Sequence, residues 1–380
     1  AAGYLAYELN GTFEARLSAG DPTGEGPLLA FGLFDAPQLL SAAEADAMFA
    51  SLAPPAPVAS VTPRLEVAAY RRRFERLADY IRGGDVYQVN LSFPLDFTYA
   101  GDPLALYAAL RTRQPVAHGA VVSLGGPMIL SVSPELHLEI DKGVATTRPM
   151  KGTIGRGVDP RTDAANRAAL AACPKQRAEN LMILDLMRND LSRISRPGSV
   201  RVRDAFQVET YPTFHAMTST VSGTLSPETG LAARLAALFP CGSITGAPKV
   251  RAMEIIRELE DSPRGVYTGS IGEIAPGGQM RLNVAIRTAV LGPGGIGRYS
   301  VGSGVVDRNV EVDDDKLGFI AGVAKQIELL AIDDGDGSAL GKLHACLRIC
   351  PRGCGDEAGT SCTWSNWLDG GADRAHGRSG

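Results

Sequence analysis

The spacing of apolar positions predicts a chain of short strands interrupted by single helices. Residues 4–34, and again the stretch from Val86 onward, alternate apolar and polar positions around turn residues, as strands with one exposed face do. Residues 64–83 differ, because their apolar positions recur at helical spacing, which predicts an amphipathic helix ended by Gly83 and Gly84. The apolar stripe of this helix consists of Val67, Tyr70, Phe74, Leu77 and Ile81.

The rest of the chain follows the same scheme. Further helices are predicted at about 103–113, 175–193, 228–238 and 248–260. Further strands are predicted near 119–124, 127–133, 135–140, 200–208, 214–222, 268–275, 279–291 and 297–306. The strands between 119 and 140 are closely spaced and are therefore expected to form antiparallel hairpins. Runs of strands between single helices indicate an α+β fold with large antiparallel sheets, not a doubly wound parallel sheet.

Composition shifts divide the chain into three parts. The Pro/Ala-rich stretch "SLAPPAPVASVTP", residues 51–63, predicts a linker between N-terminal edge strands of a truncated region, 1–50, and the main domain, 64–330. From about Asp333 the chain is rich in Gly, Asp, Ser and Arg without an amphipathic period, so residues 331–380 are predicted to be a disordered or aberrant tail. The four cysteines of this tail match no common zinc-site spacing.

Charge and hydropathy exclude several classes of function. The net charge of −4 and the scattered arginines give no electrostatic basis for binding nucleic acid or a membrane surface. No apolar stretch is long enough to span a bilayer, and no signal peptide is recognisable. Cys173 and Cys241 lie far apart in the body of the chain, which fits a reducing compartment, so a cytoplasmic location is expected.

A lysine within a stretch of glycine and proline is the first candidate for chemistry. Lys151 lies in "ATTRPMKGTIGRG", which predicts a turn because its glycines permit unusual backbone angles. Glu135 begins a predicted strand sixteen residues earlier, and a hairpin would bring the two side chains together. Two interpretations remain open for this pair, a cross-strand ion pair or an acid beside an amine nucleophile.

Three further features admit a structural and a functional interpretation. Glu179 begins a helix with an apolar face, where its carboxylate either meets solvent or turns inward to hold a cation. Arg287 lies among apolar residues in a predicted strand, so it needs a buried carboxylate or an anionic ligand. The loop in "FPCGSITGAPKVRAMEII" leads to Pro248, expected at the first helical position, where free N–H groups cap the helix or hold an anion; Lys249 is expected at the surface.

Eight phrases of the sequence, in order, resemble the chorismate-binding enzyme family over about residues 4–306. They are "GDVYQVNLSF", "SVSPEL", "RPMKGT", "AENLMILDLMRNDLSRI", "GSITGAPKVRAMEII", "YTGSIGEI", "AIRTAV" and "VGSGVV". The resemblance implies that residues 64–330 form a chorismate-binding catalytic domain. It also implies a fold of two large antiparallel sheets packed face to face with helices outside, and a site between the sheets.

Two positions distinguish members of this family. The aminodeoxychorismate synthases resemble this chain in having a lysine at Lys151, where anthranilate synthases usually have alanine. Gln88 resembles the ammonia-using members, because members that add water carry a lysine there. The resemblance thus implies conversion of chorismate and ammonia to 4-amino-4-deoxychorismate, on the route to 4-aminobenzoate and folate. An anthranilate synthase component I is the alternative enzyme.

The resemblance also implies roles for individual residues. Lys151 would attack the chorismate ring, and Glu135 would protonate the leaving hydroxyl. Mg²⁺ would be the cofactor, held partly by Glu179. The residues implied to line the chorismate pocket are Gln88, His215, Thr245, Tyr267, Arg287, Gly302 and Gly304. A glutamine amidotransferase subunit is the implied partner and source of ammonia.

The chain departs from the family after residue 306. Relatives carry an acidic helix with a Glu-x-x-Glu pattern and a following lysine, whereas this chain reads "DRNVEVDDDKLGFIAG". Glu311 and Asp314 keep the acidic spacing and are the predicted additional Mg²⁺ ligands, but Lys316 is out of register. A frameshift near residue 307 would explain this departure together with the unusual tail. A non-catalytic chorismate-binding subunit is therefore a second alternative.

Overall fold

The structure, a computed structural model, describes residues 1–18 and 26–306. The predictions for Glu311, Asp314 and the tail 331–380 lie outside these residues. All described residues belong to one unit, which spans Ala1–Ile349. Among them, no helix has the length and apolar character needed to cross a membrane.

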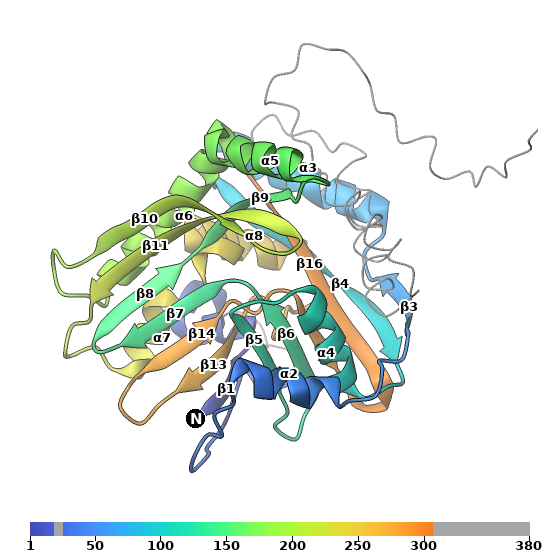
Figure 1. Ribbon diagram of the computed structural model, residues 1–380. Coiled ribbons are helices and arrows are strands. Elements are labelled where there is room, and N and C mark those ends of the chain that lie inside the picture. The colour runs from blue at the N-terminus through green and yellow to red at the C-terminus, as the bar shows by residue number, and fades with distance from the viewer. Residues whose placement is uncertain (19–25, 307–380) are drawn as a thin grey trace, which may run out of the picture. The chain divides into compact units, whose positions relative to one another are not determined.

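Nine antiparallel strands form the larger sheet, which spreads as a fan from β10 to β1 in Figure 1. In spatial order they are β10 (Arg201–Thr210), β11 (Phe214–Thr224), β8 (Val144–Arg148), β7 (Leu136–Asp141), β14 (Met280–Asn283), β13 (Ser270–Ile274), β1 (Ala2–Leu5) and β2 (Leu29–Gly32), with β9 (Met150–Gly155) also paired to β11. The N-terminal strand β1 therefore lies inside this sheet, and β2 forms its edge.

Seven antiparallel strands form the second sheet. Their order is β12 (Gly246–Ala247), β4 (Gln88–Tyr99), β16 (Ile296–Val305), β15 (Thr288–Leu291), β6 (Met128–Ser133) and β5 (His118–Val122), with β3 (Val58–Pro63) also paired to β4. The long strands β4 and β16 lie side by side over ten residue pairs, from Ile296 opposite Thr98 to Val305 opposite Val89.

Helices cover the two sheets. They are α1 (Asn10–Phe13), α2 (Ala42–Ala50), α3 (Val67–Gly83), α4 (Pro103–Arg113), α5 (Pro160–Ala172), α6 (Pro174–Ser192), α7 (Leu231–Leu238) and α8 (Lys249–Leu259), with short 3-10 turns at Tyr7–Leu9, Ala15–Leu17, Gly242–Ile244 and Pro293–Gly295. Helices α3, α4 and α8 share an apolar core with the seven-stranded sheet, whereas α6 and α7 pack on the nine-stranded sheet. The predicted α+β class with two antiparallel sheets is confirmed.

Strand β4 shows how the sequence pattern creates two different faces. Alternate residues Val89, Leu91 and Phe93 are buried in the core shared with α3 and α8. Because successive side chains of a strand point to opposite faces, the polar residues between them share the other face. These residues, Gln88, Asn90 and Ser92, are also buried, so the second face of β4 is a buried polar surface.

Several element predictions were wrong, each for a local reason. The expected linker 51–63 contains β3, which pairs with the edge of β4 despite its prolines. Helix α5 was missed because its Ala-rich sequence buries only Leu170 and so lacks an apolar stripe, although Asp159 caps it and Pro160 begins it. Pro248 is the N-cap of α8 and not its first helical residue.

The strands β6 and β7 do not form the expected hairpin, because the chain passes from one sheet to the other between them at residues 134–135. The expected single strand 279–291 likewise divides into β14 and β15, with a second crossing at residues 284–287. The crossings lie side by side: Val284 N–H donates to the Glu135 carbonyl at 3.0 Å, and Val132 N–H donates to the Arg287 carbonyl at 3.1 Å. Ser133 Oγ adds a hydrogen bond to the Val284 carbonyl at 2.6 Å.

Two residues of α3 test which face of this helix packs against the core. Leu77 has no exposed surface, whereas Val67 on the same predicted stripe is 49% exposed. We expect Leu77→Ala to lower the free energy of unfolding by about 2–5 kcal/mol, because a core cavity is created. The control Val67→Ala should change it by roughly 0.5 kcal/mol or less. Urea unfolding measures both, and equal losses would show that α3 does not bury the face described.

Candidate active site

The candidate site lies where the two crossings meet the polar face of β4. Strand β9 contributes Lys151, the first crossing contributes Glu135, and the second contributes Arg287. Strand β4 contributes Gln88, and its neighbour β16 contributes Gly304 opposite Asn90. Residues that are far apart in the sequence are thus brought together by sheet pairing and by the two crossings.

Lys151 belongs to a strand and not to the predicted turn. It follows Met150 at the start of β9, which pairs with β11. Although the residue keeps some accessible surface, burial of its amino group is the main effect on its ionisation and lowers the pKa of Lys151. The nearby carboxylates of Glu135 and Glu179 act in the opposite direction. A lysine with a lowered pKa is the form that supplies a neutral amine.

Glu135 is the second ionisable group of the site and is 3% exposed. Burial raises the pKa of this carboxyl, and hydrogen bonds from the Ser243 hydroxyl and Met150 N–H, together with Lys151, offset part of the rise. The Met150 bond measures 3.2 Å and connects Glu135 to the residue before Lys151. Burial therefore favours the neutral form of both partners, an amine beside a carboxylic acid.

Gln88 lies beside this pair. A side-chain carbon built on Gly304 would stand 3.4 Å from Gln88 Nε2 and 3.8 Å from Lys151 Nζ, which places both groups around one glycine. Gln88 is 1% exposed, and neither Nε2 nor Oε1 has a hydrogen-bond partner among the described residues. Because an unpaired buried amide is costly, a ligand that bonds to it would be stabilising.

Arg287, like Gln88, has a buried polar atom without a hydrogen-bond partner in the described part of the chain. Its backbone has a φ of +53°, so it lies in the crossing and not in the strand predicted for it. The guanidinium stands 4.6 Å above the Phe214 ring, and its Nη1 has no hydrogen-bond partner there. Burial lowers the pKa of Arg287, and the charges of Tyr299, Tyr211 and Glu135 offset part of this effect. A buried guanidinium with a free donor suits an anionic ligand.

A second cluster surrounds Gly302. A side-chain carbon at this position would stand 2.3 Å from Ser92 Oγ and 2.8 Å from Tyr267 Oη, so β16 must carry glycine here. The Tyr267 hydroxyl lies 3.4 Å from Ser92 Oγ. Thr245 is fully buried beside this cluster, and its carbonyl accepts a bond from Asn90 N–H at 2.9 Å. Three predicted pocket residues, Thr245, Tyr267 and Gly302, thus converge on β4.

His215 is held differently from the other predicted pocket residues. Its Nε2 lies 3.0 Å from Asp163 Oδ1, and its Nδ1 lies 3.0 Å from Thr210 Oγ1. Bidentate hydrogen bonding by Arg156 is the main reason that the pKa of Asp163 is well below its usual range. Both ring nitrogens are therefore engaged with protein, and His215 is connected to Arg287 through the neighbouring residue Phe214.

Glu179 is the one predicted metal ligand among the described residues. Burial raises its pKa, while Lys175 and Lys151 act to lower it. It lines a pocket of about 270 Å³ together with Lys175, Tyr87 and apolar residues. A desolvated carboxylate at a pocket fits one oxygen ligand of a hard cation. No group of three or more His, Cys, Asp or Glu side chains suited to a metal occurs within residues 1–18 and 26–306.

The sequence interpretation missed several residues that support the site. Lys249 was expected at the surface, but its amino group forms a 2.5 Å ion pair with buried Asp190 and joins α8 to α6. Ser243, Asn90 and Ser92 were not singled out. The alternation of polar and apolar positions in "QVNLS" could have indicated Asn90 and Ser92, because it predicts a strand with one polar face. The sequence alone does not reveal that this polar face is buried.

The fold of two antiparallel sheets thus brings a lysine, a carboxyl, an amide and an arginine together at the junction of the sheets. The sequence profile of the chorismate binding enzyme family matches residues 1–310, and the chain belongs to this family. The predicted resemblance is therefore confirmed.

Two relatives by sequence and one solved structure show which members of the family this chain is similar to. Aminodeoxychorismate synthase component 1 of Klebsiella aerogenes is 39% identical over 324 residues, which are 80% of this chain and 72% of that protein. Aminodeoxychorismate synthase of Streptomyces griseus is 43% identical over 266 residues, 69% of this chain but 36% of that protein. Anthranilate synthase component I of Streptococcus pneumoniae has a similar structure, with a TM-score of 0.72 at 26% identity, covering 86% of this chain and 80% of that one.

The lowered pKa of Lys151 predicts its reactivity. A small acylating reagent should modify Lys151 at a pH below that needed for an ordinary lysine, whose pKa is about 10.4. Glu135→Gln should move the reaction to still lower pH, because the Glu135 carboxylate raises the pKa of Lys151. Mass spectrometry of the peptide across a pH series measures this, with exposed Lys142 as the internal control. A profile shared by both lysines would contradict the assignment.

Proposed function

We propose that this chain converts chorismate and ammonia to 4-amino-4-deoxychorismate, the reaction of aminodeoxychorismate synthase component 1. The observation that carries the proposal is Lys151 near Glu135, where burial lowers the pKa of the amine and raises the pKa of the carboxyl. The similarity to the Klebsiella aerogenes enzyme supports it. Chorismate is a dicarboxylate, and the free donors of Arg287 and Gln88 suit such a substrate.

In the first step, Lys151 Nζ forms a bond to ring carbon C2 of chorismate. The electrons of the ring diene shift toward C4, and the C4–O bond breaks. Hydroxide is a poor leaving group, so Glu135 donates its proton and the oxygen leaves as water. The new secondary ammonium of Lys151 then passes one proton to the Glu135 carboxylate, which leaves a neutral secondary amine on C2 and regenerates the carboxylic acid.

In the second step, ammonia bonds to C4 and the diene electrons shift back, so that the bond between C2 and Lys151 breaks. Glu135 protonates the departing nitrogen, so Lys151 leaves as a neutral amine, and the new ammonium at C4 returns a proton to the Glu135 carboxylate. The ring regains the diene arrangement of chorismate, with nitrogen at C4. Overall, chorismate and ammonia give 4-amino-4-deoxychorismate and water. Gln88 lies near the same glycine, Gly304, as Lys151 Nζ and cannot act as a general base, which suits ammonia because this nucleophile needs no activation.

We also propose that the reaction requires Mg²⁺. Mg²⁺, when bound, would supply a positive charge for a substrate carboxylate. Glu179 would be one of its ligands, because this carboxylate is desolvated, lines a pocket and lies near enough to Lys151 for the lysine to lower its pKa. Glu311 and Asp314 are the proposed further ligands. Glu179 also contributes to the ionisation of Lys151, so its charge and the state of the nucleophile are linked.

An amidotransferase partner would supply the ammonia. The name "component 1" of the Klebsiella aerogenes relative implies a second component for that protein. We propose that this chain likewise works with a glutamine amidotransferase subunit, and that ammonium salts replace the partner in the test tube.

Lys151→Ala tests the nucleophile. We expect formation of aminodeoxychorismate to fall by about a thousandfold, roughly 4 kcal/mol in activation free energy, because the covalent step is lost. A small amount of product aminated at C2 is expected, since ammonia can then reach C2 directly. Chromatography of the products from chorismate, Mg²⁺ and ammonium measures both. Near-normal turnover by the variant would return Lys151 to a structural ion pair, and anthranilate from the wild type would identify the alternative enzyme.

Glu135→Gln and Glu179→Gln test the separate roles of the two carboxyls. Glu135→Gln should lower kcat while the affinity for chorismate is nearly kept, because the acid acts in the transition state. Glu179→Gln should instead raise the Mg²⁺ concentration needed for half-maximal activity, because a charged oxygen ligand is lost. Initial rates over a grid of chorismate and Mg²⁺ concentrations separate the effects. Identical kinetics of the two variants would rule out this division of roles.

A further inference from the structure

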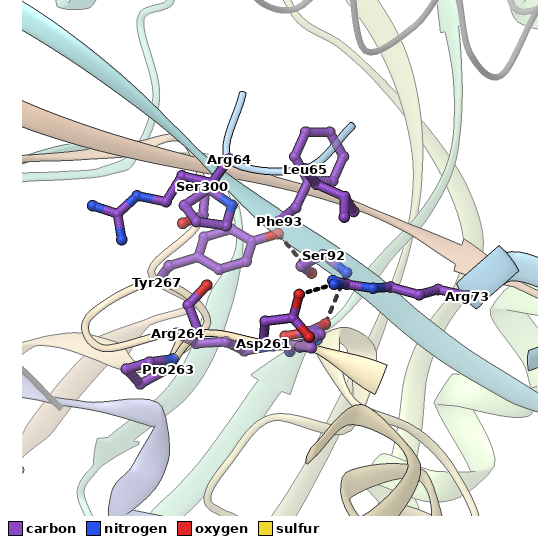
Figure 2. Close-up of a pocket in the computed structure, with 13 residues that line it drawn as sticks. Arg64, Leu65, Arg73, Ser92, Phe93, Asp261, Pro263, Arg264, Tyr267 and Ser300 are labelled. Carbon is purple, nitrogen blue, oxygen red and sulfur yellow. Dashed lines mark hydrogen bonds and ion pairs between the residues drawn. The ribbon is translucent and has the colours of Figure 1, made fainter. Parts of the chain in front are cut away.

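A buried ion pair lies behind Tyr267, outside the reacting groups discussed so far. Arg264 and Glu260 line a cavity of about 30 Å³ together with Ser92 and Tyr267, and Arg73 and Asp261 lie at the same cavity (Figure 2). The side chains of Arg264 and Glu260 are 3% and 7% exposed, respectively. Their two hydrogen bonds, Nε to Oε2 at 2.8 Å and Nη2 to Oε1 at 2.7 Å, form a bidentate pair.

All five N–H donors of the Arg264 guanidinium form hydrogen bonds within the protein. Besides the two bonds to Glu260, Nη1 donates to the Ile244 carbonyl at 3.1 Å and to Thr268 Oγ1 at 3.3 Å. Nη2 donates to the Asn90 carbonyl at 2.7 Å. The planar fork of arginine provides five donors, whereas lysine provides three from one point, so lysine cannot reproduce this pattern.

The acceptors lie on three segments that carry predicted pocket residues. Ile244 precedes Thr245, and Asn90 lies on the polar face of β4. Thr268 follows Tyr267, donates to the Tyr267 carbonyl at 2.6 Å, and has a φ of +59°, which a β-branched residue adopts only under constraint.

Glu260 extends the same network to the tyrosine hydroxyl. Its Oε1 accepts from Ser92 N–H at 2.8 Å, and Ser92 Oγ lies 3.4 Å from Tyr267 Oη. Asn90 Nδ2 donates to Ser92 Oγ at 3.1 Å. The ion pair therefore contacts both Thr268, directly after Tyr267, and the strand β4 that meets the Tyr267 hydroxyl.

We propose that Arg264, oriented by Glu260, is a positioning residue that sets the mutual placement of Thr245, Tyr267 and β4 for binding chorismate. The proposal rests on the proposed function in that it takes chorismate as the ligand. Arg264 takes no part in the proposed proton transfer or covalent chemistry, because Glu135 lies at the first crossing and Lys151 lies on β9. Its loss should therefore weaken substrate binding and leave the chemical step largely intact.

Arg264→Lys and Thr268→Val test this proposal. Arg264→Lys keeps the charge but leaves backbone acceptors without donors. Thr268→Val keeps the shape and removes the single hydroxyl that Arg264 and the Tyr267 carbonyl share, so it should fold even where Arg264→Lys does not. We expect the dissociation constant and KM for chorismate to rise about tenfold in each, the effect of one lost buried hydrogen bond, with kcat within about threefold of the wild type.

Asp261→Asn is the matched control, because Asp261 follows Glu260 and lines the same cavity but its side chain is 79% exposed. It should bind chorismate as the wild type does. Calorimetric titration with chorismate and Mg²⁺, without ammonia and with Lys151→Ala present in every protein compared, measures affinity without the covalent step, so the result is independent of which product the wild type forms. Wild-type affinity in Thr268→Val, or a fall in kcat at unchanged KM, would overturn the positioning role.

Discussion

The candidate site depends on two crossings of the chain between the sheets, hydrogen-bonded to each other. A strand that stays in one sheet presents its side chains to a single face, whereas residues 134–135 and 284–287 leave one sheet and enter the other at the same place. Glu135 and Arg287 are carried by these crossings and so lie at the junction between the two sheets. Strand β9 adds Lys151, and the polar face of β4 adds Gln88.

Burial at this junction decides the chemistry of the site. In water an adjacent lysine and glutamate exist as an ion pair, but desolvation raises the pKa of Glu135 and lowers that of Lys151. The neutral pair differs from the ion pair only in the position of one proton. The proposed roles of nucleophile and acid need only this transfer of a proton between the two side chains. Burial, with a smaller effect of the Glu135 charge, likewise raises the pKa of the neighbouring Cys241 thiol to about 12.

Periodicity predicted the elements that bury one clear face. Periodicity predicted the apolar stripe of α3 and the α+β class. The resemblance to the chorismate-binding enzymes, and not periodicity, indicated which residues would share a site. Periodicity did not predict the crossings, because "NVAIRTAV" reads as part of one strand and "SVSPELHL" as two strands of a hairpin. The hydrogen bonds that redirect the chain there come from distant segments. Lys249 was misassigned for a similar reason, since its partner Asp190 belongs to another helix. The sequence did not indicate a role for Arg264, because the acceptors of its hydrogen bonds lie on three segments that only the fold brings together.

Trapping the covalent intermediate tests the account most directly. Wild-type protein incubated with chorismate and Mg²⁺ in the absence of ammonia should acquire, on the peptide that contains Lys151, the mass of chorismate less one water. Addition of ammonium before digestion should remove the adduct, because ammonia at C4 releases the lysine. An unmodified Lys151 peptide from protein that forms aminodeoxychorismate when ammonium is present would contradict the role assigned to this lysine.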